Sequence, residues 1–430
     1  MRARHRTAAA VLLAPLLVVP LAGPAAARGW GGDDSDLAAS TAVAWQRSAI
    51  RTIYTDGAKA PPDGALYLAF TSLAVHDAAV DANRHGSPAA AAAVATAAHD
   101  VLLEYFPAGG AKLAADLAAS LAMVPDGKKK ALGVAIGAKA ADKMIASRVN
   151  DGRNNVADGP PVSPYAKAPA PGVWQPPATG MALYWLGFVD PVIDIKPVVL
   201  DGPDPLTSWK YARDYEEVRK VGELNAPLTD RSQEQTDIAK FFAAASVTMY
   251  REAVCNMLAA DPIGLLATTR LFARIDAAVA TVAIQTWRLK YEVGFWRPFQ
   301  AIAAATTDDN DATQPHPTTW APLVPNPAYS DYTSGHAAMT SPFAQVMRRT
   351  FGDRTPLVLT VGGVTRSYAT LSALEHDALN ARIWGGLHFR DAMEDGYYLG
   401  HKTANRVMRA ISDGAERDWS WRGHRGHHDD

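Results

Sequence analysis

The chain has 430 residues, of which 48% are hydrophobic and 20% are charged, and its formal net charge is −2. This composition is that of a folded globular protein with one large core or two ordinary domains, and it excludes a disordered chain and a coiled coil. The near balance of 42 basic and 44 acidic residues excludes a generally basic surface, so we expect no nucleic-acid partner.

The N-terminal residues are typical of an export signal. Three arginines among the first six residues precede an apolar run over residues 8–21, and a run of alanines ends at residue 27. This order predicts a signal peptide over residues 1–27, because the run is too short to span a bilayer; a buried N-terminal helix is the alternative. No other stretch is long and apolar enough for a membrane anchor, so we expect a secreted, extracellular protein without a membrane partner after signal cleavage.

Cys255 is the only cysteine of the chain, so no intrachain disulfide can form. It lies in an apolar helical pattern, which favours a buried, inert thiol over a nucleophile or an intermolecular bridge. The stability of the protein must therefore come from packing.

The first part of the expected mature chain has helical patterns. Alanine-rich segments with helical periodicity fill residues 37–150, and breaks rich in Gly, Pro and Asp divide them into several helices. Residues 151–180 are dense in Pro, Gly, Ala and Asn, which favours a surface loop or a boundary between helical units. We therefore expect an N-terminal helical region, with its loop, over residues 28–180.

Helical patterns resume beyond this loop. They cover residues 208–224, 232–257, 262–290, 335–351, 368–382 and 390–412. In the third of them, apolar residues from Leu271 to Val282 fall on one stripe, so this segment should be a central helix. Residues 306–333 form a second irregular stretch with five prolines, and only residues 357–364 look like a short β-hairpin arm.

The fold class that these patterns predict is all-α, with two four-helix-bundle-like halves and long loops rich in Pro and Gly. The second half would be a C-terminal helical core over residues 181–414. Residues 415–430 would form a flexible His-rich tail; metal binding there is the less favoured alternative, because nothing nearby would fix the ligand geometry.

The first segment with chemistry-bearing residues runs from Lys290 to Pro298. Lys290 and Arg297 stand seven residues apart, about two helical turns, so both side chains can point the same way. Pro298 ends the helix there. Aromatic neighbours suggest a buried setting, in which the cations would be costly without an anion; two ordinary surface charges are the alternative.

The second segment is Ser334-Gly335-His336, directly before an apolar helical run. Ser334 is a natural N-cap, and Gly335 leaves the first amide groups open to a ligand. The free N–H groups and the positive end of the helix dipole favour an oxyanion beside His336, although helix capping alone would explain the serine and the glycine.

The third segment runs from Arg382 to His388, and Gly385-Gly386 lets the chain turn back so that the two side chains approach one point. Together, the three segments would form one site for a tetrahedral or trigonal-bipyramidal oxyanion. The acidic run 308–311 is a rival cation site, but it lacks the alternating spacing and the distal glutamate of a calcium loop.

The order Lys-x6-Arg-Pro, Ser-Gly-His and Arg-x5-His is similar to the signature shared by vanadium-dependent haloperoxidases and type 2 phosphatidic acid phosphatases. The run from Lys290 to Pro298 looks especially like the fungal vanadium chloroperoxidase branch and its secreted bacterial relatives. A looser likeness extends to His76-Asp77 and to residues 172–176, so it covers most of the mature chain.

Three positions depart from the pattern of these families. Thr333 stands where Pro is usual, Ala381 stands where Ser is usual, and Ala392 stands where an acid is common. The nearest acid is Asp391, so the sequence leaves open which group orients His388.

The resemblance implies vanadate as the cofactor, with phosphate able to occupy the same site. His388 would supply the single protein bond to vanadium. The vanadate oxygens would be held by Lys290, Arg297, Ser334, Gly335 and Arg382. His336 would be the general acid/base that takes a proton from hydrogen peroxide, and Lys290 would polarise the bound peroxide. Trp287 and Tyr329 would border the halide position, with core packing as the alternative.

The implied activity is that of a haloperoxidase, which oxidises a halide with hydrogen peroxide to hypohalous acid or a halogenated product of a small organic acceptor. One alternative is a secreted soluble acid phosphatase, in which His388 would become the phosphohistidine nucleophile and His336 would protonate the leaving group. Another is a non-catalytic helical scaffold that binds phosphate. The protein would be a monomer or a homodimer.

Overall fold

The computed structural model describes residues 34–153, 163–243, 246–316 and 319–412. The predicted signal peptide (1–27) and His-rich tail (415–430) lie outside the described residues. The N-terminal helices are α1 (Asp34–Ile50), α2 (Pro61–Asn83), α3 (Ser87–Tyr105), α4 (Gly110–Ala122) and α5 (Lys128–Ser147), with a π-helix η1 (Arg51–Asp56) after α1 and a 3-10 turn η2 (Pro107–Gly109) before α4. The predicted run of alanine-rich helices is thereby confirmed.

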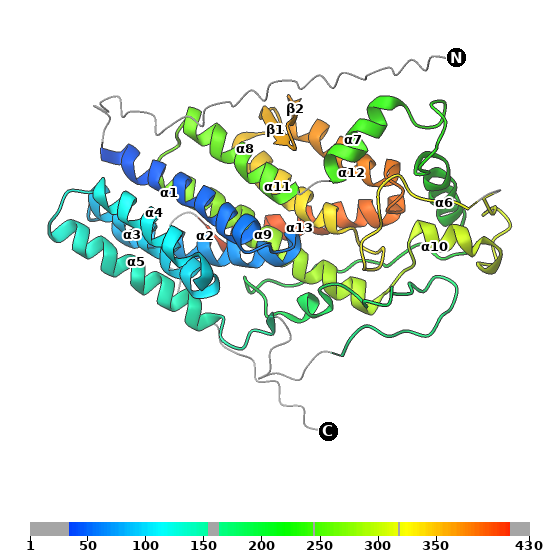
Figure 1. The fold of residues 1–430 in the computed structure, drawn as a ribbon, viewed down its shortest axis with the longest axis horizontal. Helices are drawn as coiled ribbons and strands as arrows, with labels where there is room; N and C mark the ends of the chain where they lie inside the picture. The colour runs from blue at the N-terminus through cyan, green and yellow to red at the C-terminus, as the bar shows by residue number, and fades with distance from the viewer. Residues whose placement is uncertain (1–33, 154–162, 244–245, 317–318, 413–430) are drawn as a thin grey trace, which may run out of the picture. The chain divides into compact units, whose positions relative to one another are not determined.

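The remaining elements follow a long irregular segment that contains one 3-10 turn, η4 (Tyr184–Phe188). They are α6 (Trp209–Val221), α7 (Gln233–Ala243), α8 (Ser246–Ala260), α9 (Leu265–Glu292), α10 (Pro298–Ala303), η5 (Ala305–Thr307), α11 (Gly335–Phe351), β1 (Leu357–Val361), β2 (Val364–Tyr368), α12 (Leu371–Trp384) and α13 (Arg390–Ala410). The described chain is mainly helical, which confirms the all-α prediction (Figure 1).

The segment predicted as helical over 232–257 contains α7 and α8, and residues 244–245 between them lie outside the described residues. The two helices have different neighbours, because α7 packs on α12 whereas α8 packs on α1 and β1.

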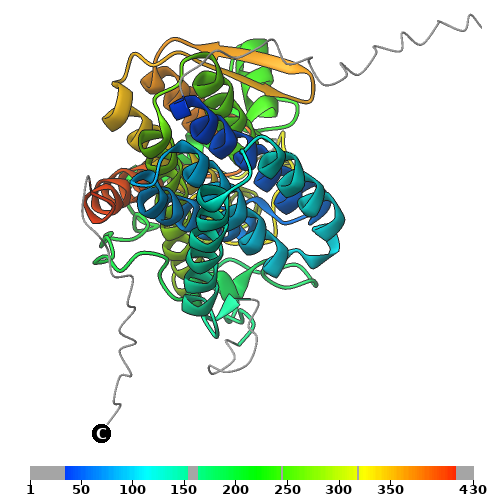
Figure 2. The same cartoon turned by 90° about the vertical axis from the view of Figure 1, so that its left-hand side faces the viewer.

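The long helix α9 is the central helix of the fold, as its apolar stripe predicted. Residues Leu271, Ile275, Val279 and Val282 are all buried. The helices α1, α2, α11 and α13 pack on α9 (Figure 1). In Figure 2 the helices α1–α5, coloured blue to teal, lie at the front of the view, with the orange hairpin at the top and the red helix α13 at the left.

Small residues allow the N-terminal helices to approach closely. A Cβ on Gly133 of α5 would lie 2.2 Å from the carbonyl oxygen of Ala89 on α3, and a Cβ on Gly137 would lie 2.4 Å from that of Ala93. Any side chain at these glycines would push the two helices apart. The alanine-rich composition therefore has a packing role in this region.

The predicted hairpin arm is confirmed, although it extends farther than residues 357–364. Strand β1 pairs antiparallel with β2 from Leu357↔Tyr368 to Val361↔Val364. The connecting residues Gly362 and Gly363 have φ values of 56° and 79°, which a two-residue turn of this hand requires. The next helix, α12, begins at Leu371, after the N-cap Thr370.

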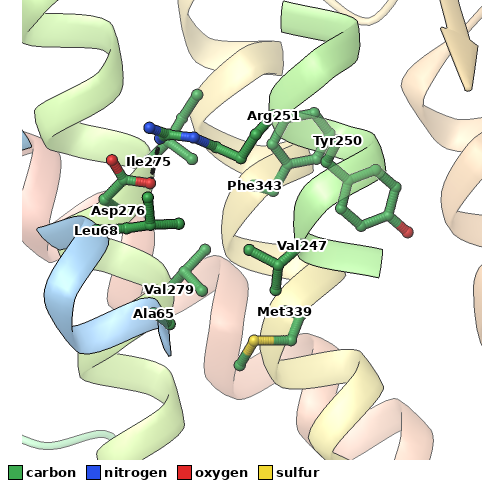
Figure 3. Close-up of a pocket in the computed structure, with 10 residues that line it drawn as sticks. All are labelled: Ala65, Leu68, Val247, Tyr250, Arg251, Ile275, Asp276, Val279, Met339 and Phe343. Atoms are coloured by element: carbon green, nitrogen blue, oxygen red, sulfur yellow. Dashed lines mark hydrogen bonds and ion pairs between the residues drawn. The ribbon is translucent and has the colours of Figure 1, made fainter. Parts of the chain in front are cut away.

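A polar cluster inside the core links four of the helices. Arg251 of α8 donates to the carboxylate of Asp276 on α9 and to the side-chain oxygen of Gln46 on α1, and Ser72 of α2 also donates to Asp276. The apolar residues around this pair come from α2, α8, α9 and α11 (Figure 3). The cluster therefore contains one positive charge, on Arg251, and one negative charge, on Asp276.

Cys255 is completely buried on α8, as its apolar surroundings predicted. Burial raises the pKa of its thiol to about 11, although the positive charge of Arg251 lowers it. Among the described residues, no helix is both long enough and apolar enough to cross a bilayer.

Candidate active site

Lys290 and Arg297 lie at adjoining helix ends. Lys290 is in the last turn of α9, and Arg297 directly precedes α10, which begins at Pro298. Both side chains are wholly buried, with an exposed fraction of 0%. The turn between them passes through Gly294, whose φ of 62° suits a residue without a side chain.

Peptide carbonyl groups hold both cations. The Lys290 ammonium donates to the carbonyl oxygens of Ser330 (2.7 Å) and Asp331 (3.0 Å). The Arg297 guanidinium donates to the carbonyl oxygens of Tyr329 (2.7 Å), Ser330 (3.3 Å) and Leu387 (2.8 Å). Carbonyl oxygens satisfy the donors without bringing a countercharge, and burial together with the charge of Arg297 lowers the pKa of the Lys290 ammonium well below its usual value.

The irregular segment after α5 covers this turn. The backbone N–H of Trp174 donates to the carbonyl of Gly294, and the N–H of Trp296 donates to the carbonyl of Gly172. A Cβ on Gly294 would lie 2.3 Å from the hydroxyl of Tyr165. The resemblance in residues 172–176 and the resemblance in residues 290–298 thus lie in direct contact.

Ser334 caps α11 as predicted, since its hydroxyl accepts a hydrogen bond from the backbone N–H of Ala337. Gly335, the first residue of the helix, lies against aromatic rings, because a Cβ there would lie 3.2 Å from the ring of Trp287 and 3.8 Å from the hydroxyl of Tyr329. The structure therefore brings both aromatic residues to the start of α11.

Tyr329 also contacts the two cations described above. The Lys290 ammonium lies 4.9 Å from the centre of its ring, and the Arg297 guanidinium lies 5.0 Å from it. Its ring centre is 5.2 Å from that of Trp287. Aromatic faces of this kind stabilise a cation without neutralising it.

Arg382 lies in the last turn of α12 and has an exposed fraction of 3%. Two of its guanidinium nitrogens, Nε and Nη1, are buried and have no hydrogen-bond partner among the described residues. Burial lowers the pKa of Arg382 to about 9, while Tyr329 raises it and Arg297 lowers it. This side chain is therefore the clearest unsatisfied donor of the site.

The chain turns from Arg382 to His388 through Gly385 and Gly386. Gly386 has a φ of 76°, and a Cβ on it would lie 2.4 Å from the carbonyl oxygen of Gly222. The backbone N–H of Leu387 donates to the carbonyl of Arg382. The glycine pair thus acts as predicted, because it turns the chain back within one short loop.

His388 is almost wholly buried, with an exposed fraction of 1%. Its Nε2 lies 3.3 Å from Nη1 of Arg297. Burial lowers its pKa well below the usual value, and so do the charges of Arg297, Lys290, Arg382 and His336, in decreasing order. The side chains of all three sequence segments therefore act on one another at short range.

His336 lies in the first turn of α11 and is partly exposed, whereas the other charged and imidazole side chains of the site are buried. Its pKa is well below the usual value because of desolvation and the positive charges of Arg382 and Arg297, whereas a hydrogen bond with the backbone of Phe242 raises it. Both imidazoles are consequently uncharged at neutral pH. An uncharged imidazole can accept a proton or offer a lone pair.

Asp331 is the site residue that the sequence did not single out. Its carboxylate is wholly buried, and Oδ1 lies 2.7 Å from Nδ1 of His388. Burial raises its pKa to about 7, against the lowering effect of Arg297 and Lys290. The sequence signal for Asp331 was indirect. Ala392 stands where related sequences commonly have the acid that follows the last histidine, and Asp331 is an acid just before Ser334-Gly335-His336.

The rival acidic run 308–311 has a different role in the structure. The carboxylate of Asp308 accepts hydrogen bonds from the hydroxyl of Thr313 and the backbone N–H of Asn310. The side-chain amide of Asn310 donates to the carbonyl of Leu206. These bonds hold the loop itself and its contact with the segment before α6.

The assembled site has three buried cations, Lys290, Arg297 and Arg382, and one carboxylate in contact with it. A buried excess of positive charge is costly unless an anion compensates it. The free donors of Arg382, the N-terminus of α11 and the cationic side chains fit a tetrahedral oxyanion such as vanadate or phosphate.

Comparisons with known proteins agree with the helical fold described above. Residues 270–416 match the family model described as the VCPO second helical-bundle domain. No curated protein matches the chain. The first bacterial vanadium-dependent iodoperoxidase is a similar solved structure, with a TM-score of 0.66 and 20% identity over 86% of this chain and 95% of that one.

Bacterial vanadium-dependent chloroperoxidase is similar in both of its forms. The apo-type structure has a TM-score of 0.64 and 17% identity over 81% of this chain and 93% of that one. The holo-type structure has a TM-score of 0.61 and 16% identity over 82% and 93%. The chain therefore has the fold of these bacterial vanadium-dependent haloperoxidases, and its C-terminal part matches the haloperoxidase family model. The matched haloperoxidase domain contains every predicted site residue from Lys290 to His388.

Proposed function

We propose that the protein is a vanadate-dependent haloperoxidase that uses hydrogen peroxide to oxidise a halide. The observation that carries the proposal is the buried positive charge beside His388, above all the unsatisfied nitrogens of Arg382. The haloperoxidase fold supports it, because the similar structures are vanadium-dependent enzymes. Phosphate has the same shape and charge type and would occupy the same site.

Bound vanadate would supply the electrophilic centre at which hydrogen peroxide becomes reactive toward a halide. His388 would hold the metal through Nε2, whose neighbour in the structure is the Arg297 guanidinium. The oxygens would be held by Lys290, Arg297, Arg382, the hydroxyl of Ser334 and the N–H of Gly335.

His336 would act as the general base toward hydrogen peroxide, since its lowered pKa leaves the ring uncharged at neutral pH. Lys290 would polarise the bound peroxide with its ammonium group. Trp287 and Tyr329, which lie against Gly335, would border the halide position. The product would be hypohalous acid, or the halogenated form of a small organic acceptor.

We also propose a secreted, extracellular location, with the protein acting as a monomer or a homodimer. The division into a 28–180 region and a 181–414 core likewise stays a prediction.

A halogenation assay tests the proposed activity. The protein is stripped of bound anions, loaded with orthovanadate and given hydrogen peroxide, with iodide, bromide or chloride in separate reactions and a phenolic dye as acceptor. We expect vanadate-dependent halogenation that falls to the level of the protein-free control in His388→Ala. Thermal unfolding of both proteins checks that the variant is folded.

A phosphatase assay in vanadate-free buffer distinguishes the alternatives. Cleavage of p-nitrophenyl phosphate that requires His388, without any halogenation, would replace the proposal with an acid phosphatase. Phosphate binding without either activity would leave only the phosphate-binding scaffold.

A further inference from the structure

We propose that Asp331 is the positioning residue of His388: its carboxylate keeps the imidazole proton on Nδ1, so that the lone pair of Nε2 points into the cationic site. The inference rests on the proposed function, in which His388 holds the metal. It concerns a pair of residues that lie 57 positions apart in the chain and meet only in the fold.

The two contacts of the imidazole ring define its tautomer. Nε2 lies 3.3 Å from Nη1 of Arg297, and a guanidinium nitrogen can only donate, so Nε2 must carry the lone pair. A neutral imidazole has one proton, which must then be on Nδ1. Nδ1 lies 2.7 Å from Oδ1 of Asp331, so the carboxylate is close enough to attract the Nδ1 proton, although the two atoms do not meet in hydrogen-bond geometry in the unliganded protein. One tautomer therefore places the proton beside the carboxylate and the lone pair toward Arg297.

The backbone of Asp331 is fixed independently of its side chain. Its N–H donates to the carbonyl of Phe295 (2.9 Å), and its own carbonyl accepts from the Lys290 ammonium (3.0 Å). A substitution that keeps the volume of the side chain leaves both bonds in place. The carboxylate can thus be altered without removing the acceptors that hold the cations.

Asp391, the nearest acid to His388 in the sequence, has other partners. Its carboxylate accepts from the backbone N–H of Asp204 (3.3 Å), and its own N–H donates to the carboxylate of Asp214 (2.9 Å). Asp391 and Asp331 line the same small cavity, of about 10 Å³. Asp391→Asn is therefore a matched control, since it removes a neighbouring negative charge without touching the His388 contact.

Asp331 could have a simpler role, which is to offset the positive charge of Lys290 and Arg297. The two roles predict opposite results for Asp331→Asn. If the carboxylate only offsets charge, its loss makes the site more positive, and orthovanadate and inorganic phosphate should both bind more tightly. If it positions His388, orthovanadate should bind more weakly, because partners behind a metal-ligating histidine contribute about 10–100-fold to metal affinity.

The experiment measures dissociation constants of orthovanadate and inorganic phosphate by titration calorimetry for the wild type, Asp331→Asn and Asp391→Asn. We expect Asp331→Asn to weaken orthovanadate binding about 10–100-fold without weakening phosphate binding, and Asp391→Asn to change neither by more than about twofold. A parallel gain for both anions in Asp331→Asn would overturn the proposal.

A second measurement uses the unliganded wild-type protein, so it does not depend on a folded variant or on vanadate. Long-range ¹H–¹⁵N spectra of ¹⁵N-histidine-labelled protein identify which nitrogen of His388 carries the proton. We expect Nδ1; a proton on Nε2 would refute the role of Asp331. Failure of the wild type to bind orthovanadate would contradict the proposed function instead, and the tautomer result would stand.

Discussion

Two buried polar centres share the helix α9 and differ in how their charges are balanced. Around Asp276, the carboxylate faces the guanidinium of Arg251 at close range (Figure 3). Ser72 and Gln46 are the neutral partners of this pair. Around Lys290, near the end of the same helix, three cations converge, and most of their partners are peptide carbonyls.

The difference separates a structural centre from a ligand site. Arg251 faces a carboxylate and has one nitrogen, Nε, without a hydrogen-bond partner among the described residues, and its side chain lines a cavity of about 10 Å³, which has room for a single water. Arg382 has two nitrogens without a partner among the described residues and no carboxylate against it. Because the fold leaves this buried charge uncompensated, it is the place where we propose that an anion binds.

Removing one partner of the paired centre should have the largest effect. Asp276→Asn leaves the Arg251 guanidinium buried without its countercharge, so we expect the free energy of unfolding to fall by about 3–5 kcal/mol. Denaturant unfolding measures it. The double variant Asp276→Leu/Arg251→Met should recover most of the loss, because it removes both charges together. A loss below about 1 kcal/mol in the single variant would mean that this pair is not a structural centre.

Removing a cation from the site around Lys290 should have the opposite effect, which is to stabilise the unliganded protein. In Arg382→Gln we expect the free energy of unfolding to rise by about 0.5–2 kcal/mol, since a buried charge without a partner disappears. Phosphate affinity, followed by calorimetry, should fall on the order of 100-fold with the lost charged hydrogen bonds.

The control for Arg382→Gln is Arg288→Gln, near the end of α9, where the arginine is half exposed and paired with Glu292. It removes the same charge outside the site and should leave phosphate affinity nearly unchanged. A less stable Arg382→Gln protein would contradict the idea that the charge there is uncompensated.

Adding an anion should stabilise the wild type by a moderate amount. Inorganic phosphate at ten times its dissociation constant should increase the free energy of unfolding by about 1.4 kcal/mol, because it binds only the folded state. Thermal unfolding with and without phosphate detects the change as a higher Tm. An equal increase in Arg382→Gln, at the same concentration, would show that the anion binds elsewhere.

Breaking an exposed ion pair should have the smallest effect on stability, and it gives a reference for the three effects above. Arg366 of β2 donates to the carboxylate of Glu234 on α7, which is 67% exposed. Water and salt screen this pair, so Glu234→Gln should lower the free energy of unfolding by no more than about 1 kcal/mol. Denaturant unfolding at low and high salt is the measurement, and a cost as large as that of Asp276→Asn would remove the distinction between buried and exposed pairs.

Part of the candidate site was predictable because its residues stand at helix ends. Ser334 caps α11 and a glycine pair follows Arg382 at the end of α12, as predicted. The prediction for Pro298 was wrong, since α9 ends at Glu292 and Pro298 begins α10. The resemblance to known motifs then indicated that the three ends meet. Their meeting is what the structure adds to the sequence.

The loop contacts were not predictable. Asp331 meets His388 through two irregular segments, and the segment around Gly172 joins Gly294 through backbone hydrogen bonds, neither of which leaves a periodic pattern in the sequence. The different neighbours of α7 and α8 were not predictable for a related reason, since both helices bury apolar faces. Periodicity reports which face of a helix is buried, not what covers it.

The close approach of Gly386 to Gly222 has a mechanical consequence. A Cβ on Gly222 would lie 2.6 Å from Cα of Gly386, and a Cβ on Gly386 would lie 2.8 Å from Cβ of Pro322, so main chain rests on main chain at this point. The spacing between Arg382 and His388 is thereby braced from outside by the turn that follows α6. A longer or displaced turn at Gly222 would therefore change the position of the His388 imidazole relative to Arg382, although the turn is far from His388 in the sequence.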